Sequence, residues 1–195
     1  MRTMEDWLSP RARRIALSAR ELLEEQGADG LTMRNLAGRL GIKAPSLYKH
    51  FASKEAIEAA LISIGFEEQA ALFRAALETE AAPIVAMGEA FRSYAKRNPQ
   101  LYRLMYDRAL NRALLAEGLE AAAAAPSLEA AGADLDLARA AFAFAHGMTI
   151  LELNGRFPAN ADLDAAWRRG LDMLQAAART RRTRGRPSSG LRAEG

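Results

Sequence analysis

Residues 31–54 read LTMRNLAGRLGIKAPSLYKHFASK, a stretch that holds five Lys or Arg residues and no acidic residue. Apolar residues recur at helical spacing on both sides of Gly41, and glycine tolerates the backbone of a tight turn. Two short helices joined by such a turn, the second one polar and basic on its outer side, form a helix-turn-helix. The second helix of this motif enters the major groove of DNA, so the stretch predicts DNA binding.

Helices are predicted on both sides of this stretch. Ser9 and Pro10 form a typical helix start, and the glycines at positions 27 and 30 are expected to end that first helix. Thr32 and Ser53 are expected to cap the helices that follow them, the second of which runs to about Glu80. The backbone N–H groups in the first turns of these two helices would be open to DNA phosphates.

The same stretch resembles the DNA-binding domain of TetR/AcrR-family transcriptional regulators. The family signature is L-T-x-R-x-L/I-A-x-x-L-G-I/V, then L-Y-x-H-F and a Lys, and the resemblance covers about 45 residues from Ala12 onward. The positions that carry the match are Leu31, Thr32, Arg34, Leu36, Ala37, Gly41, Ile42, Leu47, Tyr48, His50, Phe51 and Lys54.

The resemblance implies DNA contacts for residues of this motif. Those that would face base edges or the neighbouring phosphates are Lys43, Ala44, Pro45, Ser46 and Lys49. Those that would contact the phosphate backbone are Thr32, Tyr48, His50 and Lys54, while Arg34 would reach either kind of group. Tyr48 is expected to turn its ring inward at the same time. The family often has Ser or Thr where this chain has Lys43, so a helix cap worth about 1 kcal/mol is missing, and Pro45 partly compensates by fixing φ.

The rest of the chain also reads as helix, so the expected fold is all-α. Val occurs once in 195 residues, and no segment alternates polar and apolar residues as a strand does. Further helices are predicted over residues 83–96, from 99, up to about 125, over 135–153 and over 163–178, with a loop at 126–134. The expected domains are a three-helix helix-turn-helix domain at 9–54, a helical ligand-binding and dimerisation domain at 55–178, and a disordered basic tail at 179–195.

The formal net charge of +3 is distributed unevenly. Residues 1–54 carry ten basic and six acidic side chains, residues 55–178 carry eleven and seventeen, and residues 179–195 carry six and one. The basic first segment indicates a polyanionic partner, with a merely solvated basic face as the alternative. The tail contains RGRP at 184–187, which resembles the core of a minor-groove AT-hook; a solvated tail that adds only non-specific attraction is the alternative.

Two C-terminal helices carry more apolar surface than one short chain would readily bury. Residues 138–151 are apolar on nearly every side, and the helix from 163 has an apolar stripe. We expect four helices, two from each subunit, to form a homodimer, although burial in the chain's own core would explain the same pattern. The expected interface residues are Phe144, Met148, Leu151, Trp167, Leu171 and Leu174.

The middle of the chain concentrates aromatic and Met residues. Residues 141–158, AFAFAHGMTILELNGRFP, resemble the His-Gly segment of one class of TetR-type C-terminal domains, although Phe142 and Phe144 stand near the place where that class usually has Trp. A small, mainly apolar ligand is expected, with His146 as its hydrogen-bonding group; the alternative is core packing with a satisfied core histidine. The expected ligand-binding residues are Phe91, Tyr94, Tyr102, Met105, Tyr106, Phe142 and His146.

These features predict a cytoplasmic, dimeric transcriptional regulator, in the simplest case a repressor that binds a palindromic DNA operator and is released by its ligand. An enzyme is not expected, because the chain has two His and no Cys and lacks the usual nucleophile, metal and phosphate-loop motifs; no cofactor or metal is predicted. Attachment to a membrane surface through the basic tail is the remaining alternative. The N-terminus does not resemble a signal peptide, and the apolar run Ala140–Leu151 is too short to span a bilayer.

Overall fold

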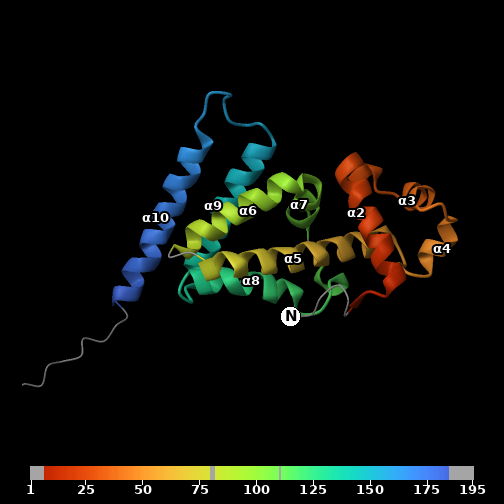
Figure 1. Ribbon diagram of the computed structural model, residues 1–195, viewed down its shortest axis with the longest axis horizontal. Coiled ribbons are helices and arrows are strands. Elements are labelled where there is room, and N and C mark those ends of the chain that lie inside the picture. The colour runs from red at the N-terminus through yellow and green to blue at the C-terminus, as the bar shows by residue number, and fades with distance from the viewer. Residues whose placement is uncertain (1–6, 80–81, 110, 185–195) are drawn as a thin grey trace, which may run out of the picture.

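One long helix, α5 (Lys54–Thr79), runs through the computed structural model and contacts both of its helical domains (Figure 1). The structure describes residues 7–79, 82–109 and 111–184, and every regular element within these ranges is a helix, which confirms the all-α expectation. Helices α2 (Pro10–Gly30), α3 (Met33–Arg39) and α4 (Ala44–Tyr48) gather at one end of α5. The other elements are α6 (Pro83–Arg97), α7 (Pro99–Tyr106), the 3-10 helix η1 (Arg112–Leu114), α8 (Leu119–Ala130), α9 (Leu135–Leu153) and α10 (Leu163–Arg184).

The predicted helix caps of the first domain are confirmed. The side chain of Ser9 accepts a hydrogen bond from the amide of Ala12 at 3.3 Å, and that of Ser53 accepts one from Ala56 at 3.3 Å. Thr32 caps α3 in the same way, and these bonds satisfy amides that a helix leaves without an internal partner. The side chain at the N-cap of α4, Lys43, makes no such bond, as its residue type predicts.

Two glycines determine how α2, α3 and α4 are joined. Gly27 has φ 70° and ψ −178°, which kinks α2 but does not end it, because the helix resumes and runs to Gly30. The helix therefore ends within the predicted residues, at Gly30, after a kink at Gly27 and one further turn. Gly41 has φ 64° in the turn between α3 and α4, a conformation that residues with a Cβ rarely adopt.

The first domain is held together by apolar residues that four helices share. Leu36, Leu47 and Phe51 are buried against α2 and the start of α5, as the motif predicts, while Leu40 and Ile42 are partly buried at the edge of the same core. A second core joins the far half of α5 to α6, α7, α8, α9 and α10. Its largest buried side chains are Phe73, Phe91, Tyr102, Trp167 and Leu171.

The structure differs from the prediction around Pro126. This proline was expected to begin a loop, but it lies inside α8, which continues to Ala130. A proline inside a helix loses one backbone hydrogen bond, at a cost of about 3 kcal/mol. Burial of Pro126 and Ala130 offsets that cost, and the amide of Ala131 still bonds the carbonyl of Ser127 at 3.1 Å.

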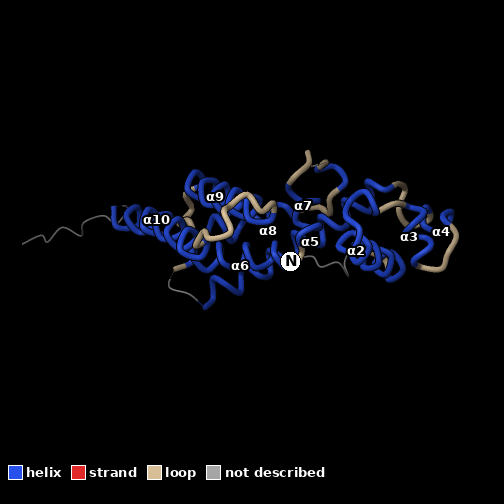
Figure 2. The backbone as a smooth tube through the Cα atoms, turned by 90° about the horizontal axis from the view of Figure 1, so that it is seen from above, coloured by secondary structure: helices blue, strands red, loops and turns tan. Residues whose placement is uncertain are grey.

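The last helix is longer than its apolar stripe. α10 continues beyond Ala178 to Arg184, so the first residues of the segment predicted to be disordered are helical, in keeping with the high helix propensity of Ala and Arg. The rest of the predicted tail, including most of the RGRP sequence, lies outside the described residues. Figure 1 and Figure 2 both place α10 at the opposite end of the molecule from α3 and α4. None of the described helices is long and apolar enough to cross a membrane.

Candidate DNA-binding surface and ligand cavity

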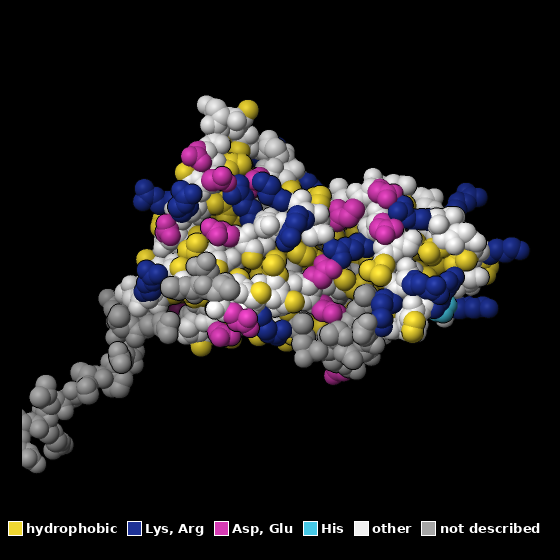
Figure 3. Space-filling model, viewed as in Figure 1, with side chains coloured by type: hydrophobic (Ala, Val, Ile, Leu, Met, Phe, Trp, Pro, Cys, Tyr) yellow, Lys and Arg dark blue, Asp and Glu magenta, His cyan; other side chains and the backbone are white. Residues whose placement is uncertain are grey.

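The basic surface at one end of the molecule is formed by α3, α4 and the turns beside them. Figure 3 shows Lys and Arg side chains projecting from this end. Of the residues implied in DNA contact, four are half-buried, namely Thr32, Ala44, Ser46 and Lys54. The exposed ones are Arg34, Lys43, Pro45, Tyr48, Lys49 and His50.

Helix α4 has five residues, so the core rather than its own hydrogen bonds holds it in place. Leu47 is fully buried and Phe51 nearly so, and the amides of His50 and Phe51 both reach the carbonyl of Leu47, at 2.8 and 3.0 Å. This anchor leaves the opposite face of α4 in solvent. The ring of Tyr48 stands on that outer face with 52% of its surface exposed, so the expectation that it turns inward was wrong.

The cations near this surface fall into two groups. Arg34, Lys43 and Lys49 have no ion-pair partner among the described residues, so their charge is available to an anion. Arg39 instead bonds the carboxylates of Glu25 and Glu21, at 2.6 and 3.1 Å, and thereby fastens α3 to α2. The hydrogen bond from Arg39 lowers the pKa of Glu25, as expected for a carboxylate paired with a guanidinium.

The resemblance implies that Lys54 contacts a phosphate, but in this structure its ammonium binds groups of the protein itself. Its ammonium donates to the carbonyl of Ala28 at 2.8 Å and lies 3.4 Å from the carboxylate of Glu58. The side chain therefore joins the start of α5 to the end of α2 in this structure. A phosphate contact by Lys54 would have to use the remaining N–H groups of the ammonium or replace these bonds.

A small apolar cavity of about 50 Å³ lies in the second domain among α5, α6, α8, α9 and α10. Two of the predicted ligand-binding residues, Phe91 and Phe142, line it. Phe142 is 43% exposed, so this lining residue also borders solvent. The other lining residues are Phe73, Ile84, Met87, Gly88, Ser127, Ala130, Ala138, Ala141, Ala145 and Leu171.

Three more of the predicted residues form an aromatic cluster beside this cavity. The hydroxyl of Tyr102 lies 2.7 Å from Nδ1 of His146, and the ring of His146 stacks on Phe142 with centroids 5.9 Å apart. Burial lowers the pKa of His146 and raises the pKa of Tyr102, which favours the neutral form of both side chains in this hydrogen bond. Tyr106 contacts Phe91 and Phe142 through its ring and donates its hydroxyl hydrogen to Oε1 of Gln69 at 2.6 Å.

The two remaining predicted ligand residues lie elsewhere. Tyr94 and Met105 belong to the core that α5 shares with α2 and α7, and neither lines the cavity. The hydroxyl of Tyr94 donates to the carboxylate of Glu68 at 3.0 Å, and Glu68 is ion-paired with Arg20 of α2. The helical spacing of Phe91 and Tyr94 correctly predicted that Tyr94 is buried. It did not show that Tyr94 packs into the first core and not into the second.

Helix α7 connects the aromatic cluster to the DNA-binding domain. The carboxylate of Glu24, on α2, accepts hydrogen bonds from the first amides of α7, those of Gln100 and Leu101, at 3.1 and 2.9 Å. The guanidinium of Arg20 adds a bond to Oδ1 of Asn98 at 2.8 Å. The same short helix presents Tyr102 to the cluster, so one rigid element touches both sites. Nothing in the sequence signalled these contacts, because the partners are more than 70 residues apart.

The residues predicted at a dimer interface differ in how deeply the chain's own core buries them. Trp167 and Leu171 are buried in the chain's own core, at 3% and 1% exposure, which is the alternative explanation of the apolar stripe. Phe144 packs its ring edge against Trp167 with centroids 5.7 Å apart. Leu151 is 41% exposed. Met148 and Leu174 are half-buried.

An all-helical chain with a basic helix-turn-helix at one end and a cavity-bearing helical domain at the other belongs to the class of DNA-binding transcriptional regulators. Residues 15–61 match the family described as bacterial regulatory proteins, tetR family. Residues 84–174 match the family described as tetracyclin repressor-like, C-terminal domain. The chain belongs to the TetR family of transcriptional regulators.

The similarity to individual relatives is concentrated in the first domain. Over 47 residues the chain is 51% identical to the class A tetracycline repressor from transposon 1721 of Escherichia coli, which covers 24% of this chain and 22% of that protein. The match thus spans about a fifth of the length of this relative.

Solved structures agree over most of the fold. A protein of unknown function from Rhodococcus sp. RHA1 is 26% identical with a TM-score of 0.69, covering 88% of this chain and 97% of that one. A TetR variant from Acinetobacter baumannii AYE in complex with minocycline is 24% identical with a TM-score of 0.62, covering 86% and 96%.

Proposed function

We propose that this regulator binds a palindromic DNA operator as a homodimer and is released from it by a small, mainly apolar ligand. The observation that carries the proposal is the basic surface of α3 and α4. Arg34, Lys43 and Lys49 are exposed there without ion-pair partners in the described part of the chain, and buried Leu47 holds α4 rigidly. A repressor of this kind would act in the cytoplasm, where the DNA is, and no catalytic role or cofactor is proposed.

The outer faces of α9 and α10 support the homodimer. Between Arg139 and Glu152, α9 carries no charged residue, and its exposed positions include Ala140, Ala143 and Leu151. On α10, Met173 is 66% exposed. An uncharged face of this extent in water favours a second copy of the same chain, and two-fold symmetry would bring the same helices of each subunit together.

The cavity supports a small apolar ligand. Its lining is almost entirely apolar, but at about 50 Å³ it is smaller than the roughly 300–1,000 Å³ that drug-sized ligands occupy. A larger ligand would therefore have to displace side chains, and half-exposed Phe142 is the one that can move into solvent. The Acinetobacter relative with bound minocycline shows that a protein of this fold accommodates a small molecule.

Release from DNA would be transmitted through α7, which contacts both the aromatic cluster and α2. A ligand that displaces Phe142 also presses on Tyr106 and His146, which contact it. Movement of α7 would then change how Glu24 and Arg20 hold α2, and with it the placement of α4. Ligand and DNA would oppose each other because each favours a different arrangement of the same helices.

Selection of duplexes from a random library tests the DNA-binding part of this proposal. The full chain should enrich inverted repeats whose two halves are spaced by about one turn of DNA. Affinity for the enriched duplex should fall steeply as the salt concentration rises, with a log–log slope near −0.9 for each phosphate neutralised. Enrichment of no sequence over the starting library would overturn the proposal of operator recognition.

A further inference from the structure

A second recess, separate from the apolar cavity, lies between α6 and the first turns of α10. It is a cleft of about 530 Å³ open to solvent, ten times the volume of the apolar cavity and within the range of small-molecule sites. Four basic side chains line it, together with two acidic ones and the indole of Trp167. The charged residues are Arg92, Lys96, Arg97, Arg168, Glu89 and Asp164.

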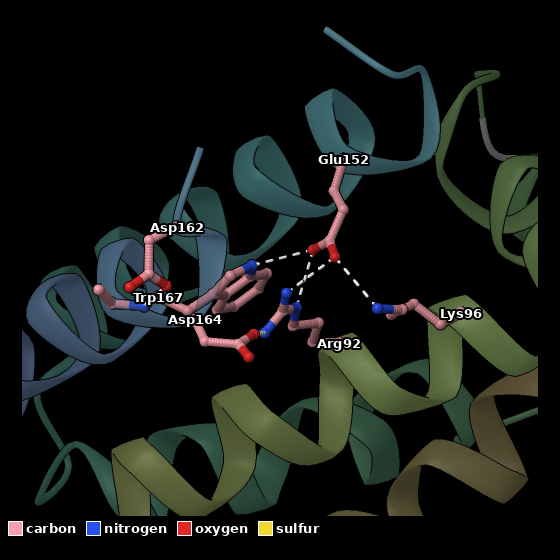
Figure 4. A network of polar contacts seen from close by, with 7 residues as sticks. Arg92, Lys96, Glu152, Asp162, Asp164 and Trp167 are labelled. Carbon is pink, nitrogen blue, oxygen red and sulfur yellow. Dashed lines mark hydrogen bonds and ion pairs between the residues drawn. The ribbon is translucent and has the colours of Figure 1, made fainter. Parts of the chain in front are cut away.

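The guanidinium of Arg92 is positioned in this cleft by a carboxylate behind it (Figure 4). Its Nε and Nη2 both donate to Glu152 at 2.8 Å, and the group lies over the ring of Trp167 at 5.3 Å from the centroid. The indole Nε1 donates to the same carboxylate at 3.1 Å, which fixes the ring as well. Arg92 therefore keeps one orientation whether or not anything occupies the cleft.

The third nitrogen of the Arg92 guanidinium, Nη1, is bound to another carboxylate that lines the cleft. Nη1 donates to Oδ1 of Asp164 at 2.6 Å, and Figure 4 shows Asp164 on the opposite side of the guanidinium from Glu152. The side chain of Asp164 is 75% exposed, whereas that of Glu152 is 13% exposed. Since an exposed ion pair contributes little free energy, an incoming carboxylate can replace Asp164 at small cost.

The other cations around the cleft have N–H groups that bond no described residue. Lys96 donates one N–H to Glu152 at 3.2 Å, and Arg97 donates through Nε to the carbonyl of Ser93 at 3.3 Å. Arg168 makes neither a hydrogen bond nor an ion pair with any residue that the structure describes. These groups come from α6 and α10, the two helices that line the cleft.

We propose that this cleft binds a small organic anion carrying two or more carboxylates, and that one of these carboxylates takes the place of Asp164 on Arg92. Lys96, Arg97 and Arg168 bind the remaining carboxylates. At about 100° per residue, Asp164 lies about 180° and Arg168 about 140° around α10 from exposed Met173, so a dimer through the Met173 face leaves the cleft open. The site does not depend on the proposed operator or on the apolar cavity.

Titration with citrate, a tricarboxylate, tests this site in the full chain at constant ionic strength. Trp7→Phe leaves Trp167 as the one Trp, whose emission should change saturably as Arg92 exchanges its partner. If Trp7→Phe does not fold, calorimetric titration of the unaltered chain measures the same dissociation constant. Arg97→Gln and Arg168→Gln should each weaken citrate binding by about five- to tenfold. Arg14→Gln, the same charge change at an exposed position of α2 in the first domain, should leave it unchanged.

Two comparisons discriminate this site from general attraction between charges. Asp164→Asn removes the competing carboxylate and should tighten citrate binding by about two- to fivefold. Asp172→Asn makes the same change in net charge two turns further along α10 and should have no effect. Equal effects of these two variants, or the absence of saturation with citrate, would overturn the proposal. Inorganic phosphate should bind at least about tenfold more weakly, and phosphate binding as tight as citrate would overturn the assignment to an organic polycarboxylate.

Discussion

Glu24 on α2 caps the N-terminus of α7, its carboxylate accepting the amide hydrogen of Leu101 at 2.9 Å across 77 residues of sequence. A carboxylate at a helix N-terminus is favoured both by the open amides and by the helix dipole. One side chain of the DNA-binding domain thus caps the helix that carries Tyr102 of the aromatic cluster beside the apolar cavity.

Glu24→Ala should lower the free energy of unfolding by about 1–3 kcal/mol, because it removes two hydrogen bonds to a charged acceptor. Urea denaturation followed by circular dichroism measures this loss. Glu25→Ala is the matched control on the next residue, where the carboxylate is paired with Arg39 on the surface. It should cost clearly less, and equal losses would show that Glu24 contributes no more than a surface ion pair.

Lys49→Ala and Lys43→Ala should weaken DNA binding and alter sequence preference. Each should also make the salt slope shallower by about 0.9 for every phosphate that the variant no longer neutralises. Arg39→Ala is the control. It also removes a positive charge from the first domain, but this charge is already paired with Glu25 and Glu21. We expect it to lower the melting temperature and leave the salt slope unchanged. Fluorescence anisotropy at several salt concentrations measures the slopes, and a larger change for Arg39→Ala than for Lys49→Ala would contradict the assignment.

A small aromatic probe such as 2-naphthol should raise the melting temperature and lower operator affinity together, since both effects follow from one differential affinity. Phe142→Ala should remove or greatly reduce both responses, because its ring borders the cavity. Leu135→Ala, at another exposed apolar position of α9 that does not line the cavity, is the control. Unchanged responses in Phe142→Ala would place the ligand elsewhere.

The stability of the second domain should depend on pH through Glu152. Hydrogen bonds from Arg92, together with those from Lys96 and Trp167, lower the pKa of Glu152 from 4.5 to about 2. Because folding lowers this pKa, the stabilisation is fully present above about pH 4.5 and is lost as the pH falls toward 2. It amounts to on the order of 2 kcal/mol, allowing for screening by solvent.

Glu152→Gln should therefore flatten the fall in stability across that pH range, as measured by urea denaturation at several pH values. Glu129→Gln, at an exposed position on α8, should retain the full pH dependence. An unchanged profile in Glu152→Gln would mean that other carboxylates account for the acid sensitivity.

Gly147→Glu should convert the proposed dimer into monomers. A Cβ at Gly147 would meet no atom within 4 Å in a single chain, so the substitution is tolerated by the subunit itself. In a dimer through α9 it would bury a charge without a partner. Sedimentation velocity measures the mass, and Gly38→Glu, at an equally open glycine on α3, should remain dimeric. A dimeric Gly147→Glu would place the interface on another face.

Sequence predicted the first domain well because its decisive contacts are local. The cap of Thr32 reaches three residues along the chain, and the turn at Gly41 depends on one dihedral angle. The links from Glu24 to Leu101 and from Tyr94 to Glu68 depend instead on which helices pack together, which spacing within one helix does not show. For the same reason the apolar stripe of α10 did not reveal that Trp167 faces its own core.

The small size of the apolar cavity has a consequence for how proteins of this design diversify. Since the ring of half-exposed Phe142 borders it, a change at that one position resizes the site while Glu24 continues to hold α7 and Leu47 continues to hold α4. In the mechanism proposed above, effector preference would then change from one lineage to another while the recognised DNA sequence stays the same.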